Sequence, residues 1–385
     1  MVRPVDVVNR IGEGTQRRFT SKLHETRIAA VLGIALGVSF SVCFVTGLLS
    51  HLIQHPPSWF AWPPRPAGLY RITQGLHVTT GFMAIPLLLA KLWVVSPRLW
   101  TWPPVRNVAH AVERISLVPL VGGSVFMLFS GLANVARWYP YGFYFPSAHF
   151  AIAWVTIGGL VAHIAAKVTS TRDALRRSPP PGLVTASGVD RRVFLGGVAA
   201  TTGLVALATS GGTIAPLSGI SALAQRVPTA GPQGLPVNKS AAAARVRDIA
   251  TGDDYRLVVD GAVTNPLSLS LEELRALPQS SAVLPITCVE GWSRGASWSG
   301  VAVRDLLAMA GAHEGASVRV ESIERGSRYR TSDLNVAVAH DRDTLLALDI
   351  NGAPLHLDHG FPVRLIAPNR PGVMQTKWVI KVVVR

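Results

Sequence analysis

Cys288 is the residue of this chain whose surroundings best suit redox chemistry. It lies in the run Ile286-Thr-Cys-Val-Glu-Gly-Trp-Ser293, where an apolar stretch ends in a Gly-Trp-Ser turn. The chain has only 2 cysteines, and Cys43 lies about 245 positions earlier in another apolar stretch. A disulfide framework and a zinc site of clustered cysteines are therefore disfavoured. Two interpretations remain open: a buried core cysteine, the common state of a free thiol, or a soft ligand for a metal that arrives with a cofactor.

Histidines in apolar stretches are the second candidates for chemistry. His149 and His163 are 14 residues apart, a spacing that puts both on one side of a helix, about 21 Å apart. Two haems stacked along one helix need such a separation. An ionisable side chain at membrane depth is a functional hypothesis because it is costly there, and a structural pair is the alternative. His77 in the second stretch is the expected partner of His149, and His24 before the first is that of His163.

The elements that carry these histidines are predicted membrane spans. Of 385 residues, 49% are hydrophobic and only 15% are charged, which is a membrane-protein composition. Apolar stretches close to the ~20 residues of a spanning helix lie near 28–50, 71–95, 115–136 and 148–168, and a shorter one covers 193–212. The loops between them are rich in Trp, Tyr and Pro, as expected at a membrane interface.

Lysine and arginine predict the orientation of these spans. They gather before the first stretch, between the second and third, and after the fourth, whereas the other two loops hold little beyond Arg65 and Arg137. Because basic residues favour the cytoplasmic side, both ends of the four-span unit are expected there. This pattern largely explains the net charge of +15. Membrane lipid is therefore a predicted partner and nucleic acid is not.

A further motif predicts where the rest of the chain lies. Ser187-Gly-Val-Asp-Arg-Arg-Val-Phe-Leu195 resembles a twin-arginine export signal at an internal position. An ordinary basic flank is the alternative and predicts the same topology. Residues after about 225 are thus expected on the extracytoplasmic side of a bacterial-type cytoplasmic membrane. Ala222-Leu-Ala224 has the form of a cleavage site, so retention of the fifth segment stays open.

Short β-rich runs begin at about residue 253 and predict an α+β domain. They are 256–259, 282–286, 318–322, 363–366 and 378–384, with helical pieces near 270–277 and 303–310. Ser270 and Glu273 have the spacing of a capping box.

This domain resembles the molybdopterin domain of the sulfite oxidase family over residues 253–385. The resemblance rests on the segments Cys288-Val-Glu-Gly-Trp-Ser293, 298–307, 343–346, 351–355, 359–365 and Lys377-Trp378, which occur in the family's order. It implies a molybdopterin-dependent oxidoreductase, with molybdenum held by the pterin dithiolene and the Cys288 thiolate. The pterin contacts that it implies are Ser322, His359, Arg364, Gln375, Thr376 and Lys377.

The substrate-side residues depart from the sulfite oxidases. Those enzymes hold an oxyanion with the arginines of a Cys-Ala-Gly-Asn-Arg-Arg pattern, whereas here Cys288 precedes Val-Glu-Gly-Trp-Ser-Arg294. This variant is closer to the bacterial sulfoxide-reductase branch, although the Asn-Phe-Tyr segment expected upstream is missing and Asn238 is a guess at its replacement. We assign Arg294 and Tyr329 as catalytic candidates. Other substrate-side candidates, each with a structural role as its alternative, are Arg330, Arg370 and Trp292.

Residues 20–168 resemble the dihaem b-type cytochrome subunits of formate dehydrogenases and hydrogenases. The resemblance implies two b haems and electron exchange with membrane quinone. In those subunits the first-span histidine falls near Ala30 of this chain, but His24 comes nearly two turns earlier. The outer pair, His77 and His149, therefore fits better than the inner pair.

The expected fold is multi-domain: an all-α transmembrane four-helix bundle and a fifth membrane helix, followed by an α+β sulfite-oxidase-like domain. The expected divisions are a cytoplasmic N-terminus 1–27, a cytochrome-like unit 28–168, a linker 169–192, a fifth segment 193–212, a second linker 213–252 and the molybdopterin domain 253–385. The predicted function is two-electron oxygen-atom transfer on a small sulfoxide-like or sulfite-like compound, coupled to quinone. A haem-free anchor with a separate redox partner and a non-catalytic membrane sensor are the alternatives.

Overall fold

The computed structural model describes residues 21–99, 108–176, 190–224 and 230–385. Three parts of the predicted organisation lie outside the described residues: 1–20 of the expected N-terminal segment 1–27, part of the basic loop after the second span, and Ser187–Val189 of the twin-arginine motif. The chain forms two compact units. One holds residues up to Thr46 and Leu76–Thr209, and the other holds Gly47–Gly75 and Ser210–Arg385.

Five helices of the described chain are long and apolar enough to cross a membrane. They are α2 (Thr26–Gln54), α3 (Leu69–Leu99), α4 (Val108–Val135), α5 (Phe145–Arg176) and α6 (Arg191–Ser210), and the short 3-10 turn η1 (Lys22–His24) precedes them. The sequence prediction of five apolar helices is confirmed, although the first four extend past the apolar stretches into flanking polar residues. The structure supports a helical N-terminal region, whereas a four-helix bundle in the sense of the cytochrome subunits stays a prediction.

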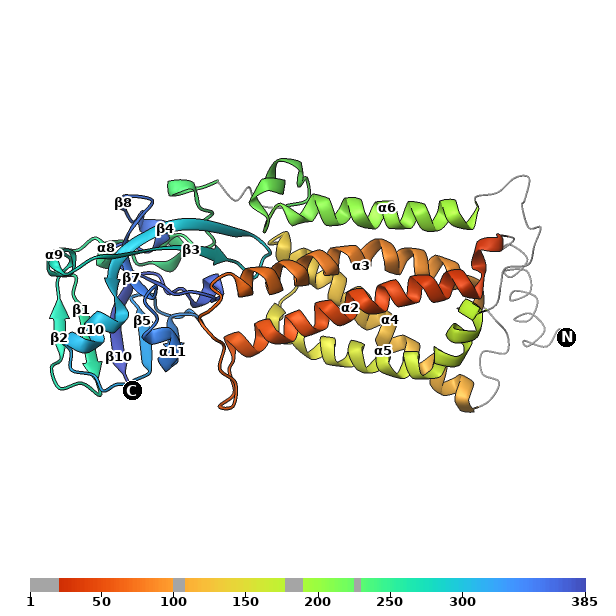
Figure 1. Ribbon diagram of the computed structural model, residues 1–385, viewed down its shortest axis with the longest axis horizontal. Helices are drawn as coiled ribbons and strands as arrows, with labels where there is room; N and C mark the ends of the chain where they lie inside the picture. Colours follow the sequence, from red (N-terminus) through yellow and green to blue (C-terminus); the bar gives the residue numbers. More distant parts are fainter. Residues whose placement is uncertain (1–20, 100–107, 177–189, 225–229) are drawn as a thin grey trace. The chain divides into compact units, whose positions relative to one another are not determined.

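Small residues let helices of the first unit approach closely. A Cβ on Gly123 of α4 would lie 2.2 Å from Thr156 Oγ1, and one on Gly159 of α5 would lie 3.1 Å from the backbone nitrogen of Leu120. Such contacts are typical of membrane helices, where small side chains allow backbones to meet. α4 and α5 therefore run side by side (Figure 1).

The C-terminal region folds as two five-stranded sheets with short helices. The first sheet has the order β2-β1-β10-β5-β6, in which only β1 and β10 are parallel, and the second has β3-β4-β7-β8 with β9 also on β7 (Figure 1). The strands are β1 (Leu257–Gly261), β2 (Leu267–Leu269), β3 (Ser280–Thr287), β4 (Ser293–Ala302), β5 (Val318–Ser322), β6 (Thr331–Leu334), β7 (Leu345–Ile350), β8 (Ala353–Pro354), β9 (Arg364–Ile366) and β10 (Val379–Val384). The α+β prediction is confirmed.

The helices of this region agree with the sequence patterns where those were clear. α9 (Leu271–Ala276) starts with the predicted capping box, because Ser270 Oγ accepts from the Glu273 amide and the Glu273 carboxylate accepts from the Ser270 amide. α10 (Val303–Met309) and α11 (Val336–Ala339) complete the helices that lie between strands. The predicted runs leave out β2, β4, β6, β7 and β8. In β4 small and polar residues hide the strand pattern, whereas β7 is a short, almost fully buried apolar run without the alternation of a half-buried strand.

The segment predicted as the second linker is part of this folded unit. It contains η2 (Ala215–Ile220), η3 (Pro232–Gly234), α7 (Ala241–Ala244) and α8 (Arg247–Ala250). Four of its side chains belong to the hydrophobic core of the first sheet: Ala241, Ala244, Val246 and Ala250. The folded unit therefore begins well before residue 253, because short alanine-rich helices cover the sheet there.

Candidate active site

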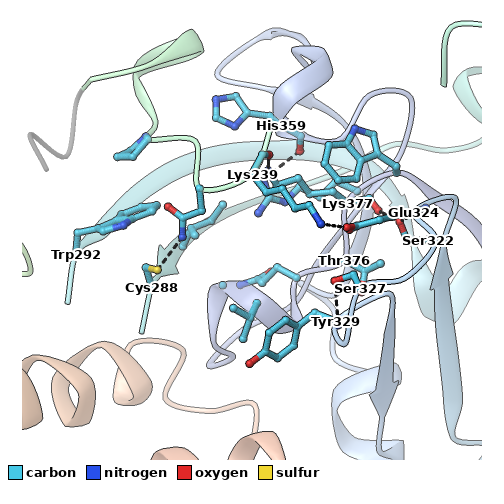
Figure 2. A pocket seen from close by; sticks show the side chains of 18 residues that line it. Lys239, Cys288, Trp292, Ser322, Glu324, Ser327, Tyr329, His359, Thr376 and Lys377 are labelled. Carbon is cyan, nitrogen blue, oxygen red and sulfur yellow. Dashed lines mark hydrogen bonds and ion pairs between the residues drawn. The ribbon is translucent and has the colours of Figure 1, made fainter. Parts of the chain in front are cut away.

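A pocket in the C-terminal unit brings together eight of the nine residues predicted for its chemistry (Figure 2). Those eight are Cys288, Ser322, Tyr329, His359, Arg364, Gln375, Thr376 and Lys377. They come from the ends of strands and the turns between them, so the two sheets jointly build the pocket. Sequence distance hid this arrangement, since Cys288 and Lys377 are almost ninety positions apart.

Cys288 lies in the tight loop between β3 and β4. The loop closes through the Cys288 amide, which donates to the carbonyl of Trp292 at 2.9 Å, and it turns at Gly291, whose φ is +94°. The thiol is buried, and its Sγ accepts hydrogen bonds from Asn238 Nδ2 at 2.8 Å and from the Glu290 amide at 3.4 Å. Donors aimed at sulfur favour the thiolate, which is the form that binds metal.

Cations gather at the opposite end of the pocket. Lys377 Nζ donates to the carbonyls of Lys239 and Asp358 at 2.7 and 2.8 Å, and Arg364 Nη1 donates to the His359 carbonyl at 3.0 Å. Lys239 itself pairs with the buried carboxylate of Glu324. The result is a basic wall suited to an anionic group such as a phosphate.

The backbone around Lys377 adopts conformations that are rare outside glycine. Trp378 has a φ of +53° while its side chain is 1% exposed, and its indole donates to the Leu357 carbonyl at 2.8 Å. A bulky residue at positive φ is an outlier that the surrounding fold must hold in place. At Gly360, with φ +112°, an added Cβ would lie 3.1 Å from Lys377 Cβ and 3.2 Å from Arg364 Cβ. Only glycine lets the two cationic residues come this close together.

Burial sets the charge states in the pocket. It lowers the pKa of Arg364 to about 9, and burial together with the neighbouring Arg364 lowers the pKa of Lys377 to about 7. Burial also lowers the pKa of His359 to about 4. Since the His359 Nε2 lies 2.7 Å from the Pro232 carbonyl, which can only accept, the neutral ring carries its proton on Nε2.

Three buried donors in the pocket wall lack partners among the residues that the structure describes. They are Arg364 Nε, Gln375 Nε2 and Thr376 Oγ1. Each belongs to a residue that is at most 3% exposed. Buried donors are nearly always paired in proteins, so their arrangement fits a bound group that supplies acceptors, as the phosphate and ring of a pterin would.

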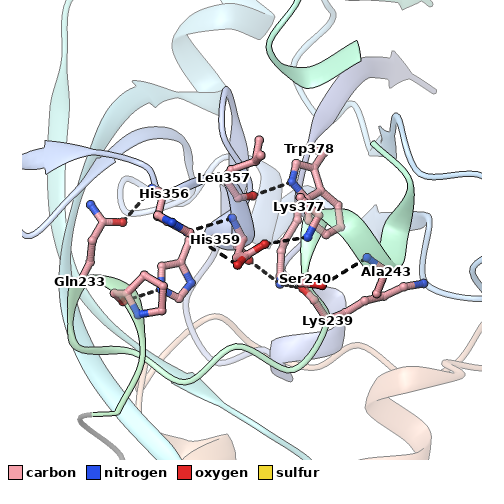
Figure 3. Close-up of polar contacts among 12 residues, drawn as sticks. Gln233, Lys239, Ser240, Ala243, His356, Leu357, His359, Lys377 and Trp378 are labelled. Carbon is pink, nitrogen blue, oxygen red and sulfur yellow. Dashed lines mark hydrogen bonds and ion pairs between the residues drawn. The ribbon is translucent and has the colours of Figure 1, made fainter. Parts of the chain in front are cut away.

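The segment 232–244 forms one side of the pocket through contacts with the turn at 356–359 (Figure 3). Gln233 Oε1 accepts from the His356 amide at 2.8 Å, and Asp358 Oδ1 accepts from the Ala241 amide at 2.7 Å. These bonds hold the segment in place, so that Asn238 and Lys239 line the pocket. No strand or helix periodicity marks this stretch, so the sequence predicts a linker here and points to Asn238 only weakly.

Three arginines proposed for the substrate side lie outside this pocket. Arg294 is on β4 and is not among the residues that line it, and Arg330 is exposed and pairs with Glu321 at 3.8 Å. Arg370 is buried and donates to Ser332 Oγ and the Asp333 carbonyl, both at 2.9 Å. Arg294 therefore does not line this pocket, and its role as a catalytic residue stays a prediction. Trp292 and Tyr329 do line the pocket, as the sequence analysis expected.

A second candidate site lies between helices of the first unit. The rings of His77 on α3 and His149 on α5 have centroids 6.4 Å apart. Two axial imidazoles on one iron, with metal–nitrogen bonds of about 2 Å and ring centres about 1 Å further out, need about 6 Å. The two residues therefore have the separation that a shared haem iron requires.

Hydrogen bonds fix the tautomers of these two histidines. His77 Nδ1 lies 2.8 Å from the Cys43 carbonyl, which can only accept, so the proton is on Nδ1 and the Nε2 lone pair is available to a metal. His149 Nδ1 lies 2.9 Å from Ser130 Oγ, and that hydroxyl has a carbonyl acceptor of its own at Met127, 3.3 Å away. A ring nitrogen held in this way is the usual support of a metal-binding histidine.

The inner pair has a different setting. His24 lies against the ring of Trp93, with centroids 4.7 Å apart, and its Nδ1 meets the Val94 carbonyl at 3.0 Å. His163 lies on α5, 14 residues after His149. Ligation by His24 and His163 stays a prediction.

Comparison with known proteins bears on the C-terminal region. Residues 243–385 match the model of the family described as the oxidoreductase molybdopterin binding domain. The C-terminal region is a molybdopterin-binding domain of the sulfite oxidase family. The molybdopterin domain thus begins at least ten residues before the boundary expected from the sequence pattern.

Two curated relatives have part of their length in common with this chain. It is 35% identical over 125 residues to the putative protein-methionine-sulfoxide reductase subunit YedZ1 of Azospira oryzae, over 32% of this chain and 47% of that protein. It is 34% identical over 160 residues to the mitochondrial sulfite oxidase of Homo sapiens, over 34% of this chain and 29% of that protein. The chain spans less than half the length of either relative. A solved structure, the sulfane dehydrogenase SoxCD from Paracoccus pantotrophus, overlaps 34% of this chain and 38% of that chain at 28% identity and a TM-score of 0.32.

Proposed function

We propose that this chain is a membrane-bound molybdenum oxidoreductase that transfers an oxygen atom from a small oxo-compound, with electrons supplied by membrane quinol through b haem. The observation that carries the proposal is the pocket that Cys288 lines together with Arg364, Gln375 and Thr376, whose atoms Nε, Nε2 and Oγ1 have no hydrogen-bond partner among the described residues. Bound molybdenum would supply a centre that accepts two electrons and exchanges one oxygen atom.

The chain's own residues would hold this cofactor from both ends. At one end the Cys288 sulfur is kept available for metal by donors from Asn238 and Glu290. At the other end Arg364 and Lys377 would bind the pterin phosphate. A phosphate beside Lys377 would restore the charge on its amine, because a neighbouring anion raises a lysine pKa.

A neutral sulfoxide is the favoured substrate class. The pocket's cations, Lys239, Arg364 and Lys377, belong to the pterin end, where Glu324 partly offsets them. Ile286, Trp292, Tyr329 and Val373 also line the pocket. An apolar and aromatic wall suits an uncharged sulfoxide better than a sulfite anion, which needs its own cations. Reducing a sulfoxide consumes two electrons and two protons and yields a sulfide and water.

The haem proposal is supported by the geometry of His77 and His149. Their ring separation and their Nδ1 hydrogen bonds suit two Nε2 ligands on one iron. Quinol oxidation would deliver electrons one at a time, which a haem can accept. A plain anchor needs one span, whereas the described chain has five candidate spans. The extracytoplasmic location of the C-terminal unit remains part of the proposal.

The deciding experiment measures iron and molybdenum per polypeptide in detergent-purified protein, together with turnover of a sulfoxide and of sulfite. The proposal predicts one Mo, one or two Fe, and a kcat/KM for a neutral sulfoxide at least about tenfold above that for sulfite oxidation. Molybdenum without iron would favour a haem-free anchor with another redox partner. Neither metal in fully matured protein would favour a non-catalytic sensor and refute the enzyme assignment.

A further inference from the structure

The loop that carries Cys288 is held from outside the molybdopterin-binding domain. Gln74, near the start of α3, donates from Nε2 to the Val289 carbonyl at 3.1 Å. Thr213, just after α6, donates from Oγ1 to the Gly291 carbonyl at 3.2 Å, and the Ser293 amide donates to the Gly212 carbonyl at 2.7 Å. All these residues belong to the same compact unit. Val289, Gly291 and Ser293 are therefore bonded by residues in the first turns of α3 and just after α6.

A second set of bonds converges on Asn369. Its side chain accepts from the Tyr70 amide at 2.6 Å and donates to the Pro63 carbonyl at 2.7 Å. Its own carbonyl accepts from Trp62 Nε1 at 3.1 Å, and its amide donates to the Ala67 carbonyl at 3.2 Å. Asn369 is 3% exposed and has a φ of +59°. Every polar group of this residue thus bonds to the stretch from Trp62 to Tyr70, which leads into the first turn of α3.

The turn that follows Asn369 leads directly to the pocket. Pro371 forms a β-bridge with Thr287, and Gly372, Val373 and Gln375 line the pocket. An added Cβ on Gly372 would lie 3.2 Å from the Thr287 carbonyl. The turn and the Cys288 loop therefore lie against each other, and a displacement of one would move the other.

Arg65, in the segment between α2 and α3, makes a further set of contacts with the C-terminal region. Its guanidinium donates to both carboxylate oxygens of Asp341 at 3.0 and 2.9 Å and to Asp343 at 2.7 Å. A planar guanidinium matches two carboxylate oxygens at once, so the contact fixes orientation as well as distance.

We propose that residues 62–74, together with Gly212 and Thr213, form a collar that positions the metal-binding loop at Cys288 and the pocket turn after Asn369. The residues of the collar are positioning residues, since they act on the site through Val289, Gly291 and Asn369. The expected effect on catalysis rests on the proposed function. The contacts between the collar and the loop do not depend on it. A cofactor site would then be assembled in part by the ends of membrane helices.

Hydrogen–deuterium exchange of the full-length protein in detergent tests the collar without relying on turnover. Asn369→Ala and Gln74→Ala should each speed exchange in peptides covering 287–293 by about tenfold. Gln74→Ala removes a hydrogen bond to the loop itself, and Asn369→Ala releases the adjoining turn, whose Pro371 bridges to Thr287. Peptides from β10, at 379–384, should exchange as in the parent protein and so report that the domain is folded. Molybdenum content should stay near that of the parent while sulfoxide turnover falls about tenfold.

Matched controls separate the collar from general loss of contacts. Asn351 also has a positive φ, +51°, and two side-chain hydrogen bonds, yet it lies in the β7–β8 turn. Asn351→Ala should leave exchange at 287–293 unchanged. Arg275→Ala, which removes the pair with Asp349, should do the same, whereas Arg65→Ala should speed exchange at 369–376.

The outcomes are distinct. If Asn369→Ala and Gln74→Ala leave exchange at 287–293 at the parent level, the collar is wrong, whatever the enzyme does. If exchange rises but no variant or parent binds molybdenum, the collar stands and the proposed function fails. Faster exchange at 379–384 in Asn369→Ala would mean that this variant loses structure throughout the domain. The test then passes to Arg65→Ala, because Arg65 is exposed. Unchanged exchange at 369–376 in Arg65→Ala would overturn the proposal.

Discussion

The side-chain amide of Asn238 donates a hydrogen bond of 2.8 Å to the Sγ of Cys288, 50 positions later in the chain. A second donor, the Glu290 amide, approaches the same sulfur from within its own loop. The thiol is therefore a buried sulfur with two donors directed at it, and an inert core cysteine would not need them.

Replacing Cys288 should separate its role from that of the other cysteine. Cys288→Ser should lower sulfoxide turnover with an artificial reductant by at least about 100-fold, because an alkoxide is a poor soft-metal ligand at neutral pH. The control is Cys43→Ser, which should keep molybdenum content and artificial-donor turnover within about twofold. Full molybdenum-dependent activity in Cys288→Ser would remove this residue from the metal's ligands.

Gly360 should be required for cofactor retention. Gly360→Ala would force its new methyl toward Lys377 and Arg364, at 3.1 and 3.2 Å, and so should lower the molybdenum content of purified protein by about tenfold or more. The control is Gly315→Ala, which carries the same strain of a positive φ, +91°, but meets nothing within 4 Å. Equal molybdenum in the two variants would show that the close approach to the cationic residues is unimportant.

Loss of either outer histidine should remove one haem and the quinol reaction together. His77→Ala and His149→Ala should each lose about one Fe per chain and lower quinol-dependent turnover by at least about tenfold, since one axial ligand is removed. Turnover with an artificial donor should remain, which also reports that the protein is intact. His55→Ala is the control, because His55 lies in the loop after α2. Unchanged quinol-dependent turnover in the two variants would favour the haem-free anchor.

His359 should make the cofactor-free domain sensitive to acid. Burial lowers the pKa of His359 from 6.5 to about 4, so between these values the unfolded chain binds a proton that the folded domain does not. The free energy of unfolding therefore decreases as the pH falls from 6.5 toward 4, by up to about 3 kcal/mol. His359→Gln should reduce this loss, measured as the calorimetric midpoint at pH 7 and pH 4.5.

The exposed neighbour provides the control for that measurement. The His356 side chain is 46% exposed, and His356→Gln should leave the acid sensitivity of the midpoint unchanged. Parallel pH curves for the parent protein and His359→Gln would mean that His359 takes up its proton in the folded state.

Residues with a strong local pattern were predictable from the sequence. The apolar spans, the capping box at Ser270 and Glu273, and β5 and β10 follow from composition and periodicity. The motif around Cys288 led to seven of the eight pocket residues because the family resemblance supplies their order, and Tyr329 was a separate candidate. Local patterns could not place Lys239 or Glu324, whose roles depend on an ion pair across 85 positions. They also could not exclude Arg294 from the pocket, since that depends on how β4 is placed in its sheet.

The contacts of segment 232–244 have a consequence for how such a protein can be divided or recombined. The family match starts at residue 243, yet Pro232, Asn238 and Lys239 already contact His359, Cys288 and Glu324. A catalytic module cut at the family boundary would leave behind a wall of its own pocket. The stretch that joins the last membrane helix to the enzyme is thus not interchangeable with another tether of equal length. A chimera that combines the membrane helices of one related protein with the C-terminal domain of another should therefore take this stretch from the same protein as the C-terminal domain.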